Sequence, residues 1–239
     1  MNPAQGLRIA SAFARAATRS SGSSLCGACV DVLAVTGAAI TVMSGIQSGP
    51  VCVSDPAVAA LEDLQFSLGD GPCQDAYRTE RPVLTGDLDR QASGRWPAFV
   101  ALARTSGIGG VFAYPLIAGQ AKVGVLTLYQ RVGGDLSATQ HQDGLALAEV
   151  LTETVLSLQG AAPAGTLAAG LDDAVVYRAE IYQASGMVAV QLGVPVADAL
   201  LRIRAYAFAH DRPVAAVAAA IVAHRLRLTD DRASTGEGA

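Results

Sequence analysis

The residues best suited to chemistry in this sequence are its four cysteines, at positions 26, 29, 52 and 73. Cys26 and Cys29 have the Cys-x-x-Cys spacing of half a zinc site, but no second Cys or His pair lies nearby in the sequence. The three histidines, His141, His210 and His224, are scattered. We therefore expect no bound metal and interpret the cysteines as buried or half-buried free thiols in a reducing cytoplasm.

Common catalytic motifs are missing from the sequence. It has no glycine-rich phosphate loop with a lysine, no Gly-x-Ser-x-Gly elbow and no His-Glu-x-x-His. The segment Gly69-Asp-Gly71 is similar to a phosphate cradle, but it lacks the lysine and follows a predicted helix, so we interpret it as a tight backbone turn. These observations favour a non-enzymatic protein without a cofactor.

Positive charge gathers near the C-terminus, although the whole chain carries a net charge of −4. Between Arg178 and Leu228 there are six Arg against Glu180, Asp198 and Asp211, a local balance of 6 − 3, or about +3. The overall charge argues against a chain that coats nucleic acid along its whole length. The local arginines either bind an anionic partner or only solvate the outer faces of helices, and charge patterning alone favours the second reading.

The basic segment is predicted to form three amphipathic helices. The first runs from about Asp172 to Leu192 and ends where Gly193 can adopt a left-handed cap. Pro195 and Pro213 suit the first turns of the next two helices, and both helices carry apolar residues at i, i+3, i+4 and i+7. With joints of two to four residues, these helices should form a small bundle.

The longer N-terminal part alternates between helical and strand periods. A short helix over residues 1–20 is expected to pack on the following domain or on a second subunit. The elements expected after it are a helix over 25–33, strands over 38–43 and 50–54, a helix over 57–66 capped by Asp55, a helix over 96–105, paired strands over 110–117 and 123–130, and a helix from Ser137 to about Leu158. This order predicts a mixed domain over 25–158 with a sheet and several helices.

The remaining segments read as connections. Residues 159–170 are small, uncharged and contain Gly and Pro, as is typical of a linker. The polar tail over 229–239 is expected to be disordered. The apolar run from Val32 to Met43 is too short to cross a bilayer and no signal peptide is evident, so we expect a soluble, cytoplasmic protein with no membrane partner.

The helical segment over 172–228 resembles the ANTAR domain, the three-helix RNA-binding module of bacterial transcription antiterminators. The resemblance rests on residues that match its motif: Ala184-Ser185-Gly186, Gly193-Val194, Ala199, Arg204, Ala207 and Arg212. The sequence departs from the family at Ser185, where a lysine is frequent. The absence of that charge removes one possible interaction with phosphate.

The segment over 25–158 resembles a GAF domain. The motifs are Leu68-Gly-Asp-Gly-Pro72, then Arg81-Pro-Val-Leu, and a hairpin with Gly119-Gln120 at its turn. This resemblance implies an α+β fold with an antiparallel sheet flanked by helices, followed by the all-α bundle. It also implies a domain that senses an unknown small molecule or mediates dimerisation.

Together the two resemblances imply an antiterminator that binds stem-loops in nascent RNA. Small residues in the first helix would let a phosphate or sugar approach closely, and arginines would supply bidentate contacts. Stacking side chains would read unpaired bases. The residues expected to contact RNA are Ala184, Ser185, Gly186, Arg204, Tyr206, Ala207, Arg212, His224 and Arg225.

A homodimer is also expected, because the helix from Ser137 carries more apolar surface than one sheet face needs. One stripe carries Leu145, Ala148, Leu151, Thr152, Val155 and Leu158, and the other side presents Leu147 and Val150. One stripe can therefore cover the sheet while the other meets a partner helix.

Two alternatives stay open. The first is a dimerisation or signal-binding regulator without RNA binding. The second is a GAF-fold methionine sulfoxide reductase that uses Cys73 and Cys52, although no neighbouring cation that would activate them is evident.

Overall fold

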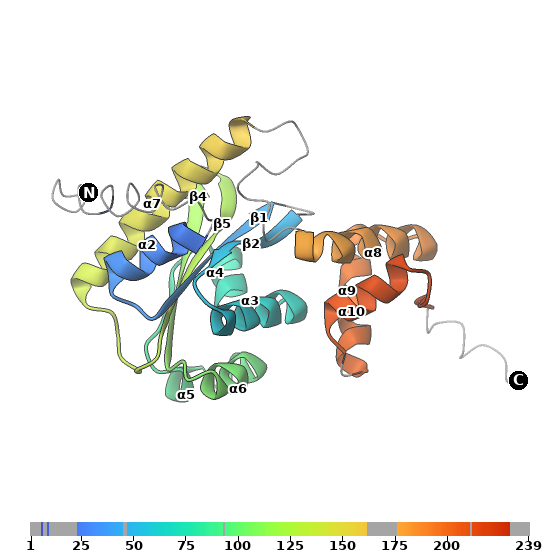
Figure 1. Cartoon of the computed structure of the whole chain (residues 1–239), viewed down its shortest axis with the longest axis horizontal. Coiled ribbons are helices and arrows are strands. Elements are labelled where there is room, and N and C mark those ends of the chain that lie inside the picture. The colour runs from blue at the N-terminus through green and yellow to red at the C-terminus, as the bar shows by residue number, and fades with distance from the viewer. Residues whose placement is uncertain are drawn as a thin grey trace, which may run out of the picture. The chain divides into compact units, whose positions relative to one another are not determined.

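The computed structural model describes residues 6, 9, 23–44, 47–92, 94–161, 176–210 and 212–229. The chain forms two compact units, over Met1–Val175 and Val176–Ala239, which are described separately. The N-terminal unit contains all strands of the described residues, and the C-terminal unit is helical (Figure 1).

The first unit is built on a five-stranded sheet in the order β2-β1-β5-β4-β3, and every neighbouring pair is antiparallel. Its strands are β1 (Gly37–Ser44), β2 (Gln47–Val53), β3 (Val83–Thr85), β4 (Gly110–Ala118) and β5 (Ala121–Gln130). The β4–β5 hairpin turns at Gly119, whose φ is 60°, in agreement with the predicted turn. This topology confirms the predicted antiparallel sheet.

Helices cover both faces of this sheet (Figure 1). On one face lie α2 (Ser23–Leu33) and α7 (Ala138–Ala161), which pack around Phe112, Leu126 and Leu128. The other face carries α3 (Pro56–Leu68), α4 (Pro72–Thr79), α5 (Leu88–Gln91) and α6 (Pro97–Thr105). The helices α4 and α5 were not anticipated from the sequence.

Two hydrophobic cores result, one on each side of the sheet. The core under α2 and α7 also contains Ile9, which is helical and only 2% exposed, so this part of the N-terminal segment packs on the domain that follows it. The core under α3, α4 and α6 is built around Trp96, Phe99 and Val125. The rest of the expected helix over 1–20, apart from Gly6, lies outside the described residues.

Several helix starts follow directly from local sequence. The carboxylate of Asp55 accepts hydrogen bonds from the amides of Ala57 (2.9 Å) and Val58 (3.1 Å), so it caps α3 as expected. Before α7, the backbone amide of Gln140 donates to Ser137 Oγ, and the backbone amide of Ser137 donates to the side-chain Oε1 of Gln140. This reciprocal pair is the predicted capping box.

Helix α7 covers the sheet with residues from both of its expected stripes. Leu147, Leu151 and Val155 are buried against the sheet, whereas Leu145 and Leu156 are each 40% exposed. The expected division into one stripe for the sheet and one for a partner helix was therefore wrong, because Leu147 from one stripe and Leu151 and Val155 from the other lie in the same core. Helix α7 also continues to Ala161, three residues into the segment expected to be a linker.

Glycine sets how closely α7 approaches the sheet. A Cβ added at Gly144 would lie 2.7 Å from Cζ of the Tyr114 ring. The Tyr114 hydroxyl in turn lies 3.0 Å from His141 Nδ1, one turn before Gly144 on α7. Burial raises the pKa of the Tyr114 phenol well above its usual value, so the hydroxyl stays protonated across the physiological range.

The second unit consists of three helices, α8 (Val176–Leu192), α9 (Val196–Ala209) and α10 (Val214–Val222). Gly193 has a φ of 63° and ends α8 in the predicted left-handed cap. Pro195 and Pro213 occupy the N-cap positions of α9 and α10. Each proline therefore directly precedes the first turn in which it was expected. Asp211 and the segment 172–175 lie outside the described residues.

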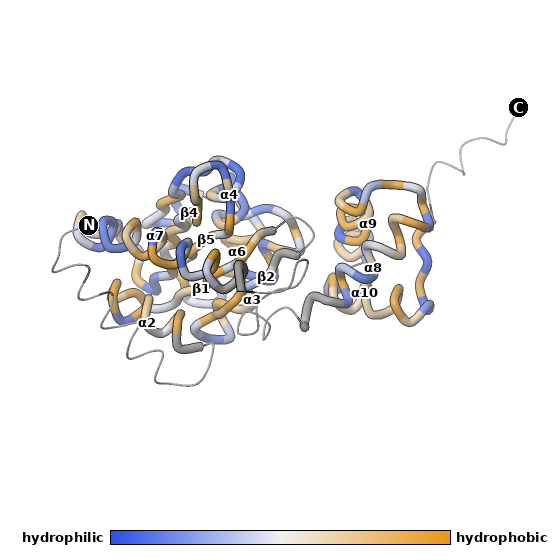
Figure 2. Tube along the Cα trace, turned by 90° about the horizontal axis from the view of Figure 1, so that it is seen from above, coloured by the Kyte–Doolittle hydropathy of each residue, from blue (hydrophilic) through white to orange (hydrophobic). Residues whose placement is uncertain are grey.

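The three helices share one small apolar core. Helices α8 and α9 carry both hydrophobic and hydrophilic residues, whereas α10 consists of Ala, Val and Ile alone (Figure 2). The buried side chains include Val188 from α8, Ile203 from α9, and Val217 and Ile221 from α10. No single helix in the described part of the chain is long and apolar enough to cross a membrane. The pair α8 and α9 has the length and composition only when taken together, and it is bent by 106° at their joint.

Candidate functional site

A buried polar cluster lies between α3 and the sheet in the first unit. Glu62 on α3 is 3% exposed, and its carboxylate accepts hydrogen bonds from the hydroxyls of Thr41 (2.9 Å) and Tyr129 (2.6 Å). Gln65 donates to Glu62 Oε1 (3.3 Å) and to the Tyr129 oxygen (3.2 Å). The oxygen of its amide accepts from the Cys73 backbone amide at 2.7 Å. One connected network therefore joins α3, α4 and the central strands.

The centre of this network is strongly shielded from water. Burial raises the pKa of Tyr129 well above its usual value, and the neighbouring negative charge of Glu62 adds to this effect. Thr127, two residues earlier on β5, is fully buried, and its hydroxyl has no hydrogen-bond partner within the described residues. A buried hydroxyl without a partner is costly.

A second polar group fixes α4 in place. The carboxylate of Asp75 accepts hydrogen bonds from Arg78, from Arg95 Nε (2.9 Å) and from Trp96 Nε1 (3.0 Å). Burial opposes ionisation of this carboxyl, but the hydrogen bonds from Arg78 and Trp96 and the two arginine charges outweigh it, so the pKa of Asp75 lies below its usual value. This ionic group therefore joins α4 to Arg95 and Trp96, which directly precede α6.

The cysteines do not behave as predicted. Cys26 on α2 and Cys52 on β2 form a disulfide with a Cα–Cα distance of 6.0 Å, which corrects our expectation of four free thiols. The reason is tertiary, because α2 packs across the edge of the sheet where β2 lies and brings two sequence-distant cysteines within bonding range. Cys29 remains a free thiol, and burial raises its pKa to about 12.

The proposed reductase pair is not assembled. Cys52 is bonded to Cys26 in the core beneath α2, whereas Cys73 belongs to the core on the opposite face of the sheet. In the described part of the chain, no group of three or more His, Cys, Asp or Glu side chains could hold a metal ion.

In the second unit, three of the predicted contact residues are buried. Ala184 and Ser185 are fully buried and Ala207 is 1% exposed. The Ser185 hydroxyl donates to the Ile181 carbonyl one turn earlier, at 2.7 Å. Small side chains at these three positions let the helices pack closely, and their contact with RNA stays a prediction.

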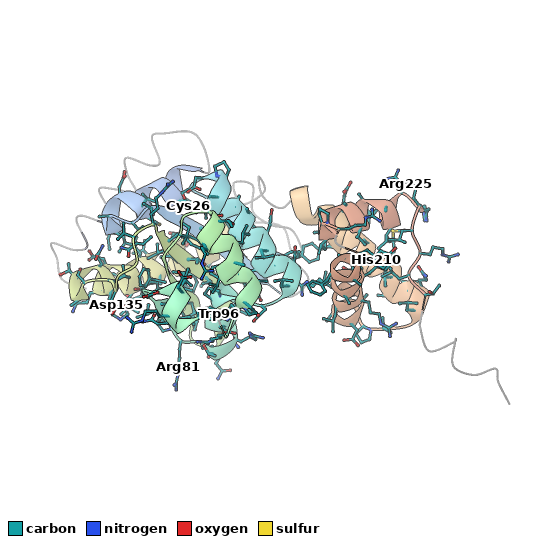
Figure 3. The ribbon with its side chains drawn as sticks, turned by 90° about the horizontal axis from the view of Figure 1, so that it is seen from below. Cys26, Arg81, Trp96, Asp135, His210 and Arg225 are labelled. Carbon is teal, nitrogen blue, oxygen red and sulfur yellow. A yellow bond between two sulfur atoms is a disulfide. The ribbon has the colours of Figure 1, made fainter. Side chains whose placement is uncertain are left out.

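The other predicted residues reach the surface. Arg212 and Arg225 are exposed, and Arg225 extends away from the ribbon in Figure 3. Arg204 and Tyr206 are partly exposed. Tyr206 stacks on His210, with ring centroids 3.9 Å apart and planes inclined by 19°, so His210 joins the aromatic surface that the sequence assigned to Tyr206 alone.

Two predicted residues meet in a groove of about 800 Å³, which we call the Gly186 groove. From α8 it is lined by Gly186, Met187, Val190 and Gln191, and from α10 and the segment after it by Ile221, His224, Leu226 and Arg227. The sequence singled out Gly186 and His224 but not Met187, Val190 or Arg227. Val190 is 87% exposed. The sequence alone did not mark it, because a valine in a helix is usually read as part of the core.

Comparison with known families gives the two units their identity. A family model described as the GAF domain matches residues 9–155, and a model of the ANTAR domain matches residues 169–222. The chain belongs to the GAF domain family. In it a GAF domain is followed by an ANTAR domain, and this pair fits a regulator rather than a catalyst.

Solved structures support the fold of the GAF domain alone. The chain is similar to the GAF domain of a phosphoenolpyruvate-protein phosphotransferase from Coxiella burnetii, at 11% identity and a TM-score of 0.51, over 65% of this chain and 95% of that one. The corresponding domain from Acinetobacter has 10% identity and a TM-score of 0.51, over 69% of this chain and 99% of that one. No curated protein matches the chain.

Proposed function

We propose that this GAF–ANTAR protein is a transcription antiterminator that binds stem-loops in nascent RNA. The ANTAR unit would hold the RNA in a fold that cannot form a terminator, and the GAF unit would control when it does so. The observation that carries the proposal is the match to the ANTAR domain in a unit whose exposed side chains include Arg212, Arg225 and Arg227. Exposed arginines suit phosphate because they present several donors in a planar fork.

A signal would reach the protein through the GAF unit. The hydroxyl of Thr127, which has no partner in the part of the chain that the structure describes, lies on the same sheet face as Thr41 and Tyr129, which bond to Glu62. We propose this face as the sensing side of the domain, with an unidentified ligand.

The GAF unit also offers a surface for a homodimer. The outward side of α7 carries Leu145 and Leu156, which lie three helical turns apart and therefore share a face. A second copy covering these side chains would place two ANTAR units in one assembly, so that two hairpins could be held with an avidity gain. Light scattering on the full chain tests this, because a monomer at all concentrations contradicts it.

Transcription in vitro tests the central proposal. A template carrying two hairpins that overlap an intrinsic terminator is transcribed by purified polymerase with and without the full-length protein. We expect the protein to increase the fraction of read-through transcript, because it stabilises the hairpins that compete with the terminator. A matched template with the same terminator and unpaired upstream sequence should show no change. Equal read-through from both templates contradicts the proposal.

A further inference from the structure

The Gly186 groove has a preformed wall on its C-terminal side. Helix α10 ends in a turn where the amides of His224 and Arg225 donate to the carbonyls of Ile221 (2.9 Å) and Ala220 (2.8 Å). Further on, Gln191 Nε2 of α8 donates to the Leu228 carbonyl, and Leu228 is buried. The segment over 224–228 is therefore fastened to both α10 and α8, so binding in the groove would not need to order it.

The floor of the groove is apolar and open. Met187, Val190, Ile221 and Leu226 supply its hydrocarbon surface. A Cβ built at Gly186 would meet no atom within 4 Å, so the space over this glycine is not filled by any described part of the chain. Its volume of about 800 Å³ lies within the usual range for pockets that hold small molecules.

The rim of the groove carries basic side chains. His224 and Arg227 line it and are exposed, and Arg225 lies between them in the sequence. None of the residues that line the groove is acidic. A free phosphate would make no use of the apolar floor. An apolar helix of a partner protein would make no use of the basic rim. A nucleotide combines both properties, because its base has a flat face of low polarity and its phosphate carries the charge.

We propose that the Gly186 groove receives an unpaired nucleobase from an RNA hairpin loop, with the flanking phosphates held by His224 and Arg227. This inference rests on the proposed RNA-binding function and deepens it, because it assigns the groove to single-stranded loop bases rather than to the stem. Met187 suits such a floor because its unbranched side chain adapts to different bases. The imidazole of His224 can stack on the base.

Gly186→Leu is the variant that separates this role from folding. The added side chain has room over the helix surface, and replacing a helical glycine favours the helix. The variant should therefore fold at least as well as the wild type, while its side chain occupies the groove. Ala205→Leu is the matched control, because Ala205 is an exposed helical residue of α9 that does not line the groove.

The assay uses the full-length protein and a pool of short hairpin RNAs with a randomised loop, from which hairpins bound by the wild type are enriched. We expect Gly186→Leu to weaken binding of the enriched hairpin about tenfold, or about 1.4 kcal/mol, and Ala205→Leu to leave it unchanged. An abasic nucleotide is then placed at each loop position in turn. At one position it should weaken wild-type binding by a similar factor and have no further effect on Gly186→Leu.

The outcomes separate the groove from the function. If the wild type enriches no hairpin, the proposed RNA-binding function fails together with the inference. Equal affinity of Gly186→Leu and wild type for an enriched hairpin overturns the groove assignment and leaves RNA binding intact. A weakening in Gly186→Leu that no abasic position shares overturns the role of a base. Unchanged RNA affinity with an altered oligomeric state in sedimentation would instead make the groove a protein-docking surface.

Discussion

Reduction of the Cys26–Cys52 disulfide should destabilise the GAF unit without affecting the ANTAR unit. The bond joins residues 26 positions apart, linking α2 to the edge strand β2. In the chain-entropy description, releasing a loop of that length costs about 3.5 kcal/mol of unfolding free energy. For a unit of this size, that decrease lowers the melting temperature by about 7 to 14 °C.

The single tryptophan of the sequence gives a selective readout of this unit. Trp96 is 1% exposed in the core beneath α3, α4 and α6, and its indole nitrogen donates to Asp75. Its fluorescence therefore follows the unfolding of the GAF unit alone. We expect the transition to move to lower temperature in the presence of a dithiol reductant.

The double variant Cys26→Ala/Cys52→Ala is the internal control. It should melt near the reduced wild type, and reductant should not shift it further. Thiol titration of the unfolded, unreduced wild type should find two thiols, from Cys29 and Cys73, and four after reduction. Four thiols before reduction, or a melting temperature that reductant leaves unchanged, would refute this reasoning.

Four other substitutions test separate features of the structure. Asp75→Asn should lower the unfolding free energy by about 2 kcal/mol at pH 7, since it removes hydrogen bonds to a charged group. The pKa of Asp75 is lower in the folded than in the unfolded state. The wild type should therefore lose this stabilisation as the pH falls from the unfolded-state pKa through the folded-state pKa. Denaturant unfolding of the Asp75→Asn variant should not show this pH dependence. Gly144→Ala should lower the unfolding free energy by about 1 to 3 kcal/mol in the same assay, because its Cβ would press on the Tyr114 ring. Gly186→Ala should instead raise it by about 0.5 to 1 kcal/mol, because its Cβ meets no atom and alanine favours the helix. The reverse order would contradict the packing at these two glycines. Ser137→Ala should cost about 1 kcal/mol by removing one half of the capping box before α7, and an unchanged unfolding midpoint would argue against that cap.

Local rules predicted much of the fold because the decisive interactions lie close in the sequence. The caps at Asp55 and Ser137 and the left-handed end of α8 at Gly193 involve partners within a few residues. The hairpin at Gly119 is equally local. The motif resemblances then supplied the order of the domains, which local rules alone do not provide.

Features that depend on tertiary contact were the ones missed. The disulfide joins Cys26 to Cys52 only because α2 crosses the sheet edge. The burial of Ser185 depends on how α9 and α10 pack against α8, and a motif position does not reveal which side of a helix is covered. The groove likewise depends on a turn after α10, where His224 takes a left-handed conformation that is uncommon outside glycine.

The salt dependence of RNA binding tests the central claim most directly. Full-length wild type and the double variant Arg204→Ala/Arg212→Ala are titrated with a labelled RNA of two hairpins over a range of salt concentrations, after circular dichroism has verified the fold of both. We predict that wild-type affinity falls steeply as salt rises, and that the slope becomes shallower by about one unit for each phosphate that the variant no longer neutralises. An affinity and slope that stay the same in the folded double variant, or a wild type that binds no RNA at low salt, would contradict the account.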